Sequence, residues 1–190
     1  NWLALADDYT IIREMIDKTI DGFNRIGEEN AFAVLARAGE LAAGGMDVIN
    51  LGIGQPDFPT PENIVEADVK ALRDGHHGYT PATGIPALRE AVSADLHRRL
   101  NVEVSPDSVL IVPGGKVTMF TAIQMFGEPG ADILYPDPGF PIYRSMIEFT
   151  GANPIPIPIR EENGFAFSAE ETLALITPQT RLIILNSPAN

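Results

Sequence analysis

The chain has 190 residues, 45% of them hydrophobic and 21% charged, a composition that is typical of a globular protein and excludes a disordered one. Acidic side chains outnumber basic ones by 26 to 13, and the resulting net charge of −13 argues against binding to nucleic acid or to an anionic membrane. The absence of cysteine excludes disulfides, thiol catalysis and cysteine-bound metal, and is compatible with the cytoplasmic location that we predict. No apolar run in the sequence approaches the roughly 20 residues of a membrane-spanning helix.

The first part of the chain is predicted to hold helices separated by one loop rich in glycine and proline. Apolar residues at helical spacing predict an amphipathic helix within residues 1–25, and a second helix is expected over residues 31–43. A short strand is expected at 48–51, before the loop LGIGQPDFPTPENI. Thr60 is the expected N-cap of the next helix, because Pro61 follows it at the position where a helix tolerates a missing N–H.

From Gly84 onward, short apolar runs alternate with amphipathic segments. This alternation predicts an α/β fold with a mostly parallel sheet that helices cover on both faces. The alternating prolines of the strand at 154–159 favour an irregular or edge strand over a central one, since proline cannot donate a ladder hydrogen bond. Helices are expected at 86–100, 115–126 and 141–149 and after Ser168, and strands at 108–112, 133–135, 154–159 and 182–185.

Ligands of open α/β sheets bind beyond the carboxyl ends of the strands, and three loops in such places carry candidate residues. In LIVPGGKVTMF a strand leads through two glycines into a helix, whose first N–H groups can bind a phosphate. Gly115, Lys116 and Val117 offer such donors, and a tight strand-to-helix turn without a ligand explains the same sequence equally well. This spacing is neither that of a P-loop nor that of a dinucleotide fingerprint.

Two further loops carry an aromatic or an amide side chain. In YPDPGFPIYRSM, Phe140 can lie flat on a planar cofactor, but Phe140 and Tyr143 at helical spacing also fit a hydrophobic core. In the terminal loop NSPAN an asparagine amide can bind a phenolic oxygen of a ring, or can only close a turn. Each of these signals is weak when it is taken alone.

Taken together and in this order, the motifs resemble those of a known family. Residues 25–190 are similar to the N-terminal half of pyridoxal-phosphate-dependent aminotransferases of fold type I, the aspartate/aromatic aminotransferase superfamily. The resemblance is carried by INLGIGQPDFPTPENI, GYTPATGIPALREAV, VPGGKVTMF, YPDPGFPIY and LNSPAN. It implies pyridoxal 5'-phosphate as the cofactor, an amino acid and a 2-oxo acid as substrates, and a homodimer.

The resemblance also implies roles for individual residues. The backbone N–H groups of Gly115 and Lys116 would bind the cofactor phosphate, and Gly114 would permit the turn that presents them. Phe140 would stack on the pyridine ring, where many relatives have tryptophan. Asn190, rather than Asn186, matches the asparagine that binds the cofactor's phenolate oxygen.

Two more residues are implied in cofactor and substrate binding. Tyr79 matches a tyrosine that reaches the cofactor phosphate of the partner subunit, and Gly54 lies in the motif beside the substrate carboxylate. On the residues alone, Tyr79 also fits a surface turn and Gly54 a loop hinge.

The lysine that forms a Schiff base with the cofactor in this family has no match in the chain. Its three lysines are Lys18, Lys70 and Lys116, and none stands in the expected context. We therefore predict that the catalytic lysine lies beyond the chain end, and that the 190 residues are an amino-terminal part that is inactive by itself. No metal site is predicted, because the three histidines show no ligand spacing with carboxylates.

The expected organisation has three parts. Residues 59–190 would be the first half of the large cofactor-binding domain, and 26–58 an N-terminal arm with part of the small domain. Residues 1–25 depart from the family and are similar to a segment of formate-dehydrogenase-like molybdopterin oxidoreductases, so a foreign origin and a family-specific helical extension both remain open. Two alternative functions also remain open: a lyase or decarboxylase of the same fold, and a non-catalytic phosphate-binding α/β module.

Overall fold

A computed structural model describes residues 20–27, 30–52 and 54–189. The chain divides into two compact units. The sheet unit consists of Asn1–Asn30 and Met119–Asn190, and the helical unit of Ala31–Thr118. Most of the segment predicted as a helix within residues 1–25 lies outside the described residues, and Asp21–Arg25 forms a 3-10 turn, η2.

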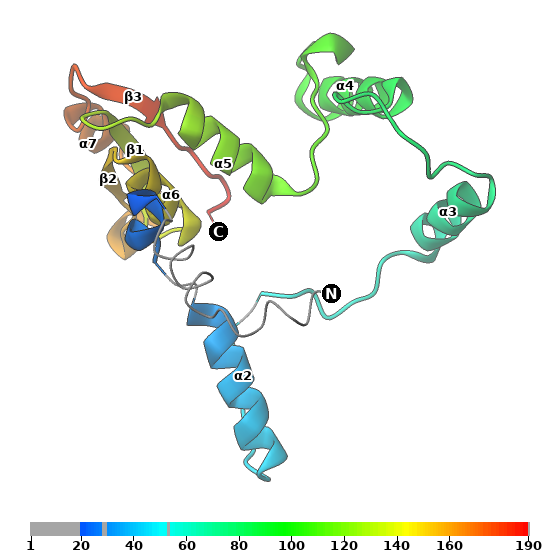
Figure 1. The fold of residues 1–190 in the computed structure, drawn as a ribbon, viewed down its shortest axis with the longest axis horizontal. Helices are drawn as coiled ribbons and strands as arrows, with labels where there is room; N and C mark the ends of the chain where they lie inside the picture. Colours follow the sequence, from blue (N-terminus) through cyan, green and yellow to red (C-terminus); the bar gives the residue numbers. More distant parts are fainter. Residues whose placement is uncertain (1–19, 28–29, 53, 190) are drawn as a thin grey trace, which may run out of the picture. The chain divides into compact units, whose positions relative to one another are not determined.

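The sheet unit confirms the predicted α/β fold with a parallel sheet (Figure 1). Its strands are β1 (Asp132–Asp137), β2 (Asn153–Pro158) and β3 (Thr180–Ile183), in the order β2-β1-β3. Strand β1 pairs in parallel with both neighbours. The helices that follow β1 and β2 are α6 (Ile142–Thr150) and α7 (Ala169–Ala174), with a short 3-10 turn, η4 (Glu161–Asn163), before α7.

The core of the sheet unit lies between β1 and α6. Ile133 of β1 and Ile147 of α6 are fully buried, and Ile123 joins them from α5 (Gly115–Phe126). Residues 131–136 are all buried because β1 has a hydrogen-bonded neighbour on each side. Such a continuous buried run is typical of the central strand of a parallel sheet.

Strand β2 is an edge strand of the described sheet, as its prolines predicted. The backbone N–H groups of Asn153 and Ile159 donate to the carbonyl oxygens of Ala131 and Asp137, respectively, in the β1 segment. The odd-numbered residues of the β2 segment therefore direct their backbone hydrogen-bonding groups toward β1. The prolines stand at the even positions between them, where the missing N–H would point to the open edge. The prolines of β2 therefore remove no hydrogen bond between β2 and β1.

The turn η2 packs against the C-terminal end of α6 (Figure 1). Arg25 donates from Nε to the carbonyl oxygen of Glu148 at 2.7 Å and from Nη2 to that of Phe149 at 3.0 Å. The Phe23 and Phe149 rings meet edge to face, with centroids 5.2 Å apart. The arginine therefore satisfies carbonyls that the last turn of any helix leaves without an intrahelical partner.

The helical unit contains α2 (Asn30–Ala43), α3 (Glu62–Arg73), α4 (Pro86–Leu100) and a 3-10 turn, η3 (Pro106–Ser108). The prediction of α4 is confirmed at both ends. The predicted N-cap Thr60 is wrong, because Pro61 occupies the cap position of α3 and makes no side-chain cap.

The strands predicted at 48–51 and 108–112 are wrong, since neither segment forms a strand in the described chain. A strand is stable only where a neighbour completes its row of hydrogen bonds. The N–H of Ile111 does donate to the carbonyl oxygen of Thr83 at 3.1 Å, but no second ladder bond follows it in the described residues. The part of the chain that the structure describes also contains no helix long and apolar enough to cross a membrane.

Candidate cofactor site

The predicted phosphate turn is a sharp bend that opens directly into α5. Gly114 has a φ of 83°, a left-handed conformation that side chains disfavour, and Gly115 is the first residue of the helix. Residues 113–118 are exposed. The N–H groups of a first helical turn point out of its end and carry the positive end of the helix dipole. This donor set suits a phosphate dianion, which the net negative charge of the chain would otherwise repel.

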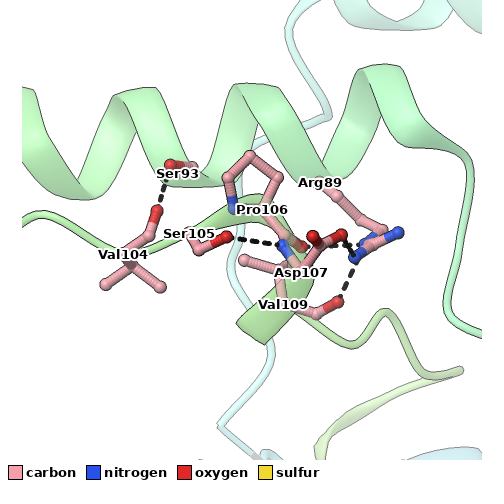
Figure 2. A network of polar contacts seen from close by, with 7 residues as sticks. All are labelled: Arg89, Ser93, Val104, Ser105, Pro106, Asp107 and Val109. Carbon is pink, nitrogen blue, oxygen red and sulfur yellow. Dashed lines mark hydrogen bonds and ion pairs between the residues drawn. The ribbon is translucent and has the colours of Figure 1, made fainter.

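A polar network holds the segment before this turn against α4 (Figure 2). The Arg89 guanidinium donates from Nε to the carbonyl oxygens of Pro106 at 2.9 Å and Val109 at 3.1 Å, and pairs with Asp107 at 2.9 Å. Ser93 donates to the carbonyl oxygen of Val104. Arginine fits this place because its planar fork supplies several donors at once, and the segment leading to Gly114 is thereby fixed to a helix.

Gly54 and Tyr79 also lie in the helical unit. Tyr79 is fully exposed, and Gly54 is exposed with open space around its α-carbon. The exposure of these two residues does not test their predicted roles in binding, which stay predictions.

Phe140 lies in the sheet unit, in the loop between β1 and α6. It is partly buried against the core, and its ring meets that of Tyr143 edge to face, with centroids 5.9 Å apart and planes at 79°. The loop is tight at Gly139, where a β-carbon would overlap the carbonyl oxygen of Pro136. Phe140 thus packs against the core but is not fully buried.

Asn186 connects the terminal loop to Tyr143, the residue that packs against Phe140. Its Nδ2 donates to the hydroxyl oxygen of Tyr143 at 3.0 Å. Tyr143, whose spacing from Phe140 fitted a hydrophobic core, is buried, with 3% of its surface exposed. Asn190 lies outside the described residues, so its predicted contact with a cofactor is untested.

The structure thus brings Phe140, Tyr143 and Asn186 together in the sheet unit. The other predicted site residues that the structure describes belong to the helical unit: Gly54, Tyr79 and Gly114–Lys116. Sequence reasoning missed the contact of Asn186 with Tyr143. The two residues are 43 positions apart, and no local pattern links them.

A hollow of about 430 Å³ opens beside the carboxyl end of β1. Burial, and secondarily the charge of Asp137, raise the pKa of Tyr135 above its ordinary value. The hydrogen bond from Arg144 to Glu148 raises the pKa of the Arg144 guanidinium above its ordinary value. The lining includes Tyr135, Asp137, Phe140, Arg144, Ser145 and Glu148. Within the described residues, no three His, Asp or Glu side chains gather in a way that could hold a metal ion.

Comparison with known proteins connects these features to one family. The family described as aminotransferase class I and II matches residues 46–190. The chain is 39% identical, over 83% of its own length, to a probable aspartate/prephenate aminotransferase of Aquifex aeolicus, and covers 40% of that protein. It is 36% identical, again over 83% of its length, to an aspartate aminotransferase of Geobacillus stearothermophilus, of which it also covers 40%.

Solved structures give the same result. An aspartate aminotransferase from Thermus thermophilus with maleate superposes with a TM-score of 0.84 and 33% identity, covering 90% of this chain and 45% of that one. An alanine aminotransferase from Pyrococcus furiosus gives a TM-score of 0.82 and 29% identity, with the same two coverages of 90% and 45%. The chain therefore spans less than half the length of these relatives. It belongs to the class I and II aminotransferase family.

Proposed function

We propose that the complete protein is an aminotransferase that uses pyridoxal 5'-phosphate to move an amino group between an amino acid and a 2-oxo acid. The observation that carries this proposal is the family match over residues 46–190, a range that includes every predicted site residue. The names of the relatives make aspartate the first amino acid to test. Pyridoxal phosphate, when bound, supplies an electron sink for the negative charge that remains when the substrate loses its α-proton.

The residues of this chain would bind and orient the cofactor. Gly115 and Lys116 would hold its phosphate through the backbone at the start of α5, and Gly114 supplies the left-handed bend that this requires. Phe140 would cover one face of the ring, and Asn190 would donate a hydrogen bond to the phenolate oxygen. Phosphate anchoring at a helix end fixes one end of the cofactor while the reacting end remains accessible.

Gly54 and Tyr79 would complete the site. Gly54 would line the substrate carboxylate, because the absence of a side chain lets the substrate approach the backbone. Tyr79 would contact the cofactor phosphate of the partner subunit in a homodimer, and its full exposure in the isolated chain supports this role. The lysine that binds the cofactor covalently would be supplied by the rest of the protein, and the location would be the cytoplasm.

An absorption spectrum of the complete protein tests the proposal. We expect a visible band from bound pyridoxal phosphate, a shift to shorter wavelength when aspartate is added, and recovery of the band with a 2-oxo acid. Succinate, which has the carboxylates of aspartate but no amino group, is the matched control and should not remove the band. A band that aspartate removes and no 2-oxo acid restores would favour a lyase or decarboxylase. A protein that stays colourless after addition of pyridoxal phosphate would refute the cofactor.

A further inference from the structure

We infer that Tyr143 is a positioning residue that fixes two loops of the proposed cofactor site relative to each other. Its ring supports Phe140, and its hydroxyl holds the side chain of Asn186. The first loop would stack on the cofactor ring, and the second leads to Asn190. This inference rests on the proposed function, since it assigns a role within that same site.

The position of Tyr143 makes it a rigid support. It lies in the first turn of α6, is only 3% exposed, and belongs to the same core as the fully buried Ile147 one turn later. A buried aromatic side chain has few accessible rotamers, because close packing resists rotation about its bonds. The edge-to-face contact with Phe140, at 5.9 Å and 79°, is a favoured geometry for two aromatic rings.

The second loop depends on the hydroxyl of Tyr143. The last backbone bond that ties the β3 segment to β1 runs from the N–H of Ile184 to the carbonyl oxygen of Leu134, at 2.9 Å. Asn186 comes two residues later, and its amide reaches the buried hydroxyl at 3.0 Å. The residues that follow, Ser187 to Ala189, are exposed. The bond from Asn186 is thus placed where the loop leaves the sheet.

A core tyrosine with a satisfied hydroxyl would show the same burial, so the test must separate positioning from packing. The variant Tyr143→Phe keeps the ring and its contact with Phe140 but removes the hydroxyl oxygen that accepts the hydrogen bond from Asn186. Replacing Asn186→Ala removes the other partner of the same bond. The variant Tyr135→Phe is the matched control, because Tyr135 is a buried tyrosine of the same unit that makes neither contact.

The experiment uses the complete protein with both single variants and the double variant. In the cofactor-free protein, hydrogen exchange of the backbone amides of residues 185–187 and 189 should rise about 3- to 10-fold in each single variant, the range for one neutral hydrogen bond. Exchange in the double variant should be no faster than in the single variants, because both changes remove the same hydrogen bond. Exchange within β1 and α6 should not change, and Tyr135→Phe should leave the loop unaffected.

Cofactor binding supplies the second readout. The affinity for pyridoxal phosphate should fall by a similar factor in Tyr143→Phe and in Asn186→Ala, and the visible circular dichroism of the bound cofactor should change, since it reports the orientation of the ring. Unchanged loop exchange, or effects that add in the double variant, would overturn the positioning role while the wild type still binds the cofactor. A wild type that binds no pyridoxal phosphate would instead refute the proposed function, and the inference with it.

Discussion

Arg25 ties a segment near the start of the chain to a helix far away in the sequence. Its guanidinium donates to two carbonyl oxygens at the end of α6, those of Glu148 and Phe149. We expect Arg25→Met, which keeps the length of the stem, to lower the free energy of unfolding by about 1 kcal/mol. Chemical denaturation at neutral pH measures this change.

The control for Arg25 is Arg37→Met. Arg37 pairs only with Glu40 one turn away, at 2.8 Å on an exposed surface, and such pairs contribute little. Its replacement should change the stability by less than about 0.5 kcal/mol. Equal effects of the two substitutions would show that η2 does not stabilise α6 through this arginine.

Gly115 allows a test of the phosphate turn that leaves the helix intact. Its φ is not in the left-handed region, and a β-carbon there would meet no atom within 4 Å. In Gly115→Asp the new carboxylate should favour the start of α5 electrostatically but repel a phosphate. We expect unchanged or slightly higher stability together with an affinity for pyridoxal phosphate at least about 10-fold lower.

The matched variant is Gly115→Asn, which adds a side chain of the same shape without the charge. It should lower the affinity for pyridoxal phosphate much less than Gly115→Asp does, and equilibrium titration followed by absorbance measures both. If the two variants bind the cofactor equally well, the phosphate does not lie at the start of α5.

Helices were predicted better than strands, and the reason is the range of the interactions that form them. The sequence predicted α4 and α5 with their ends, because helical hydrogen bonds join residues four apart and the caps are local. The predicted strands at 48–51 and 108–112 failed because a strand depends on a partner elsewhere in the chain.

The same distinction applies to the candidate site. The bend at Gly114 followed from two glycines between an apolar run and a helix, which is local information. The bond between Asn186 and Tyr143 joins two elements through the fold of the sheet unit, and no spacing in the sequence announces it. Likewise, the packing of Phe23 on Phe149 appears only when α6 is in place.

Arg89 connects α4 with the segment that leads to the phosphate turn (Figure 2). Lysine can replace its charge but not its fork of donors, so Arg89→Lys should lose the carbonyl bonds to Pro106 and Val109. We expect the amides of residues 107–112 to exchange about 3- to 10-fold faster, which mass spectrometry of the exchanged peptides measures.

A matched substitution for Arg89 is available on the same helix. Arg98 pairs with Asp95 within α4, and Arg98→Lys should leave the exchange of residues 107–112 unchanged. Faster exchange in both variants would mean that the helix itself, and not the bonds of Arg89, protects this segment.

At the scale of the whole sheet unit, one carboxylate joins all three strands at the ends where they begin. Asp132 of β1 accepts a hydrogen bond from Oγ1 of Thr177 at 2.7 Å, in the turn before β3, and from Nδ2 of Asn153 of β2 at 2.9 Å. These bonds, that from Thr177 first, hold the pKa of Asp132 below its ordinary value. The charged form is therefore favoured in the folded protein.

The sign of the pH effect follows from that direction. A carboxyl with a lowered pKa in the folded state contributes stability at pH values above its unfolded pKa, and loses it as the pH falls through the folded value. In Asp132→Asn the urea midpoint should accordingly be lower than that of the wild type at pH 7, and the difference should shrink below about pH 4. Asp68→Asn, on the exposed surface of α3, should show no such trend. The two urea midpoints could instead differ by the same amount from pH 7 to pH 3. This result would mean that Asp132 acts through its shape and not its charge, and that the three strand ends are held together independently of pH.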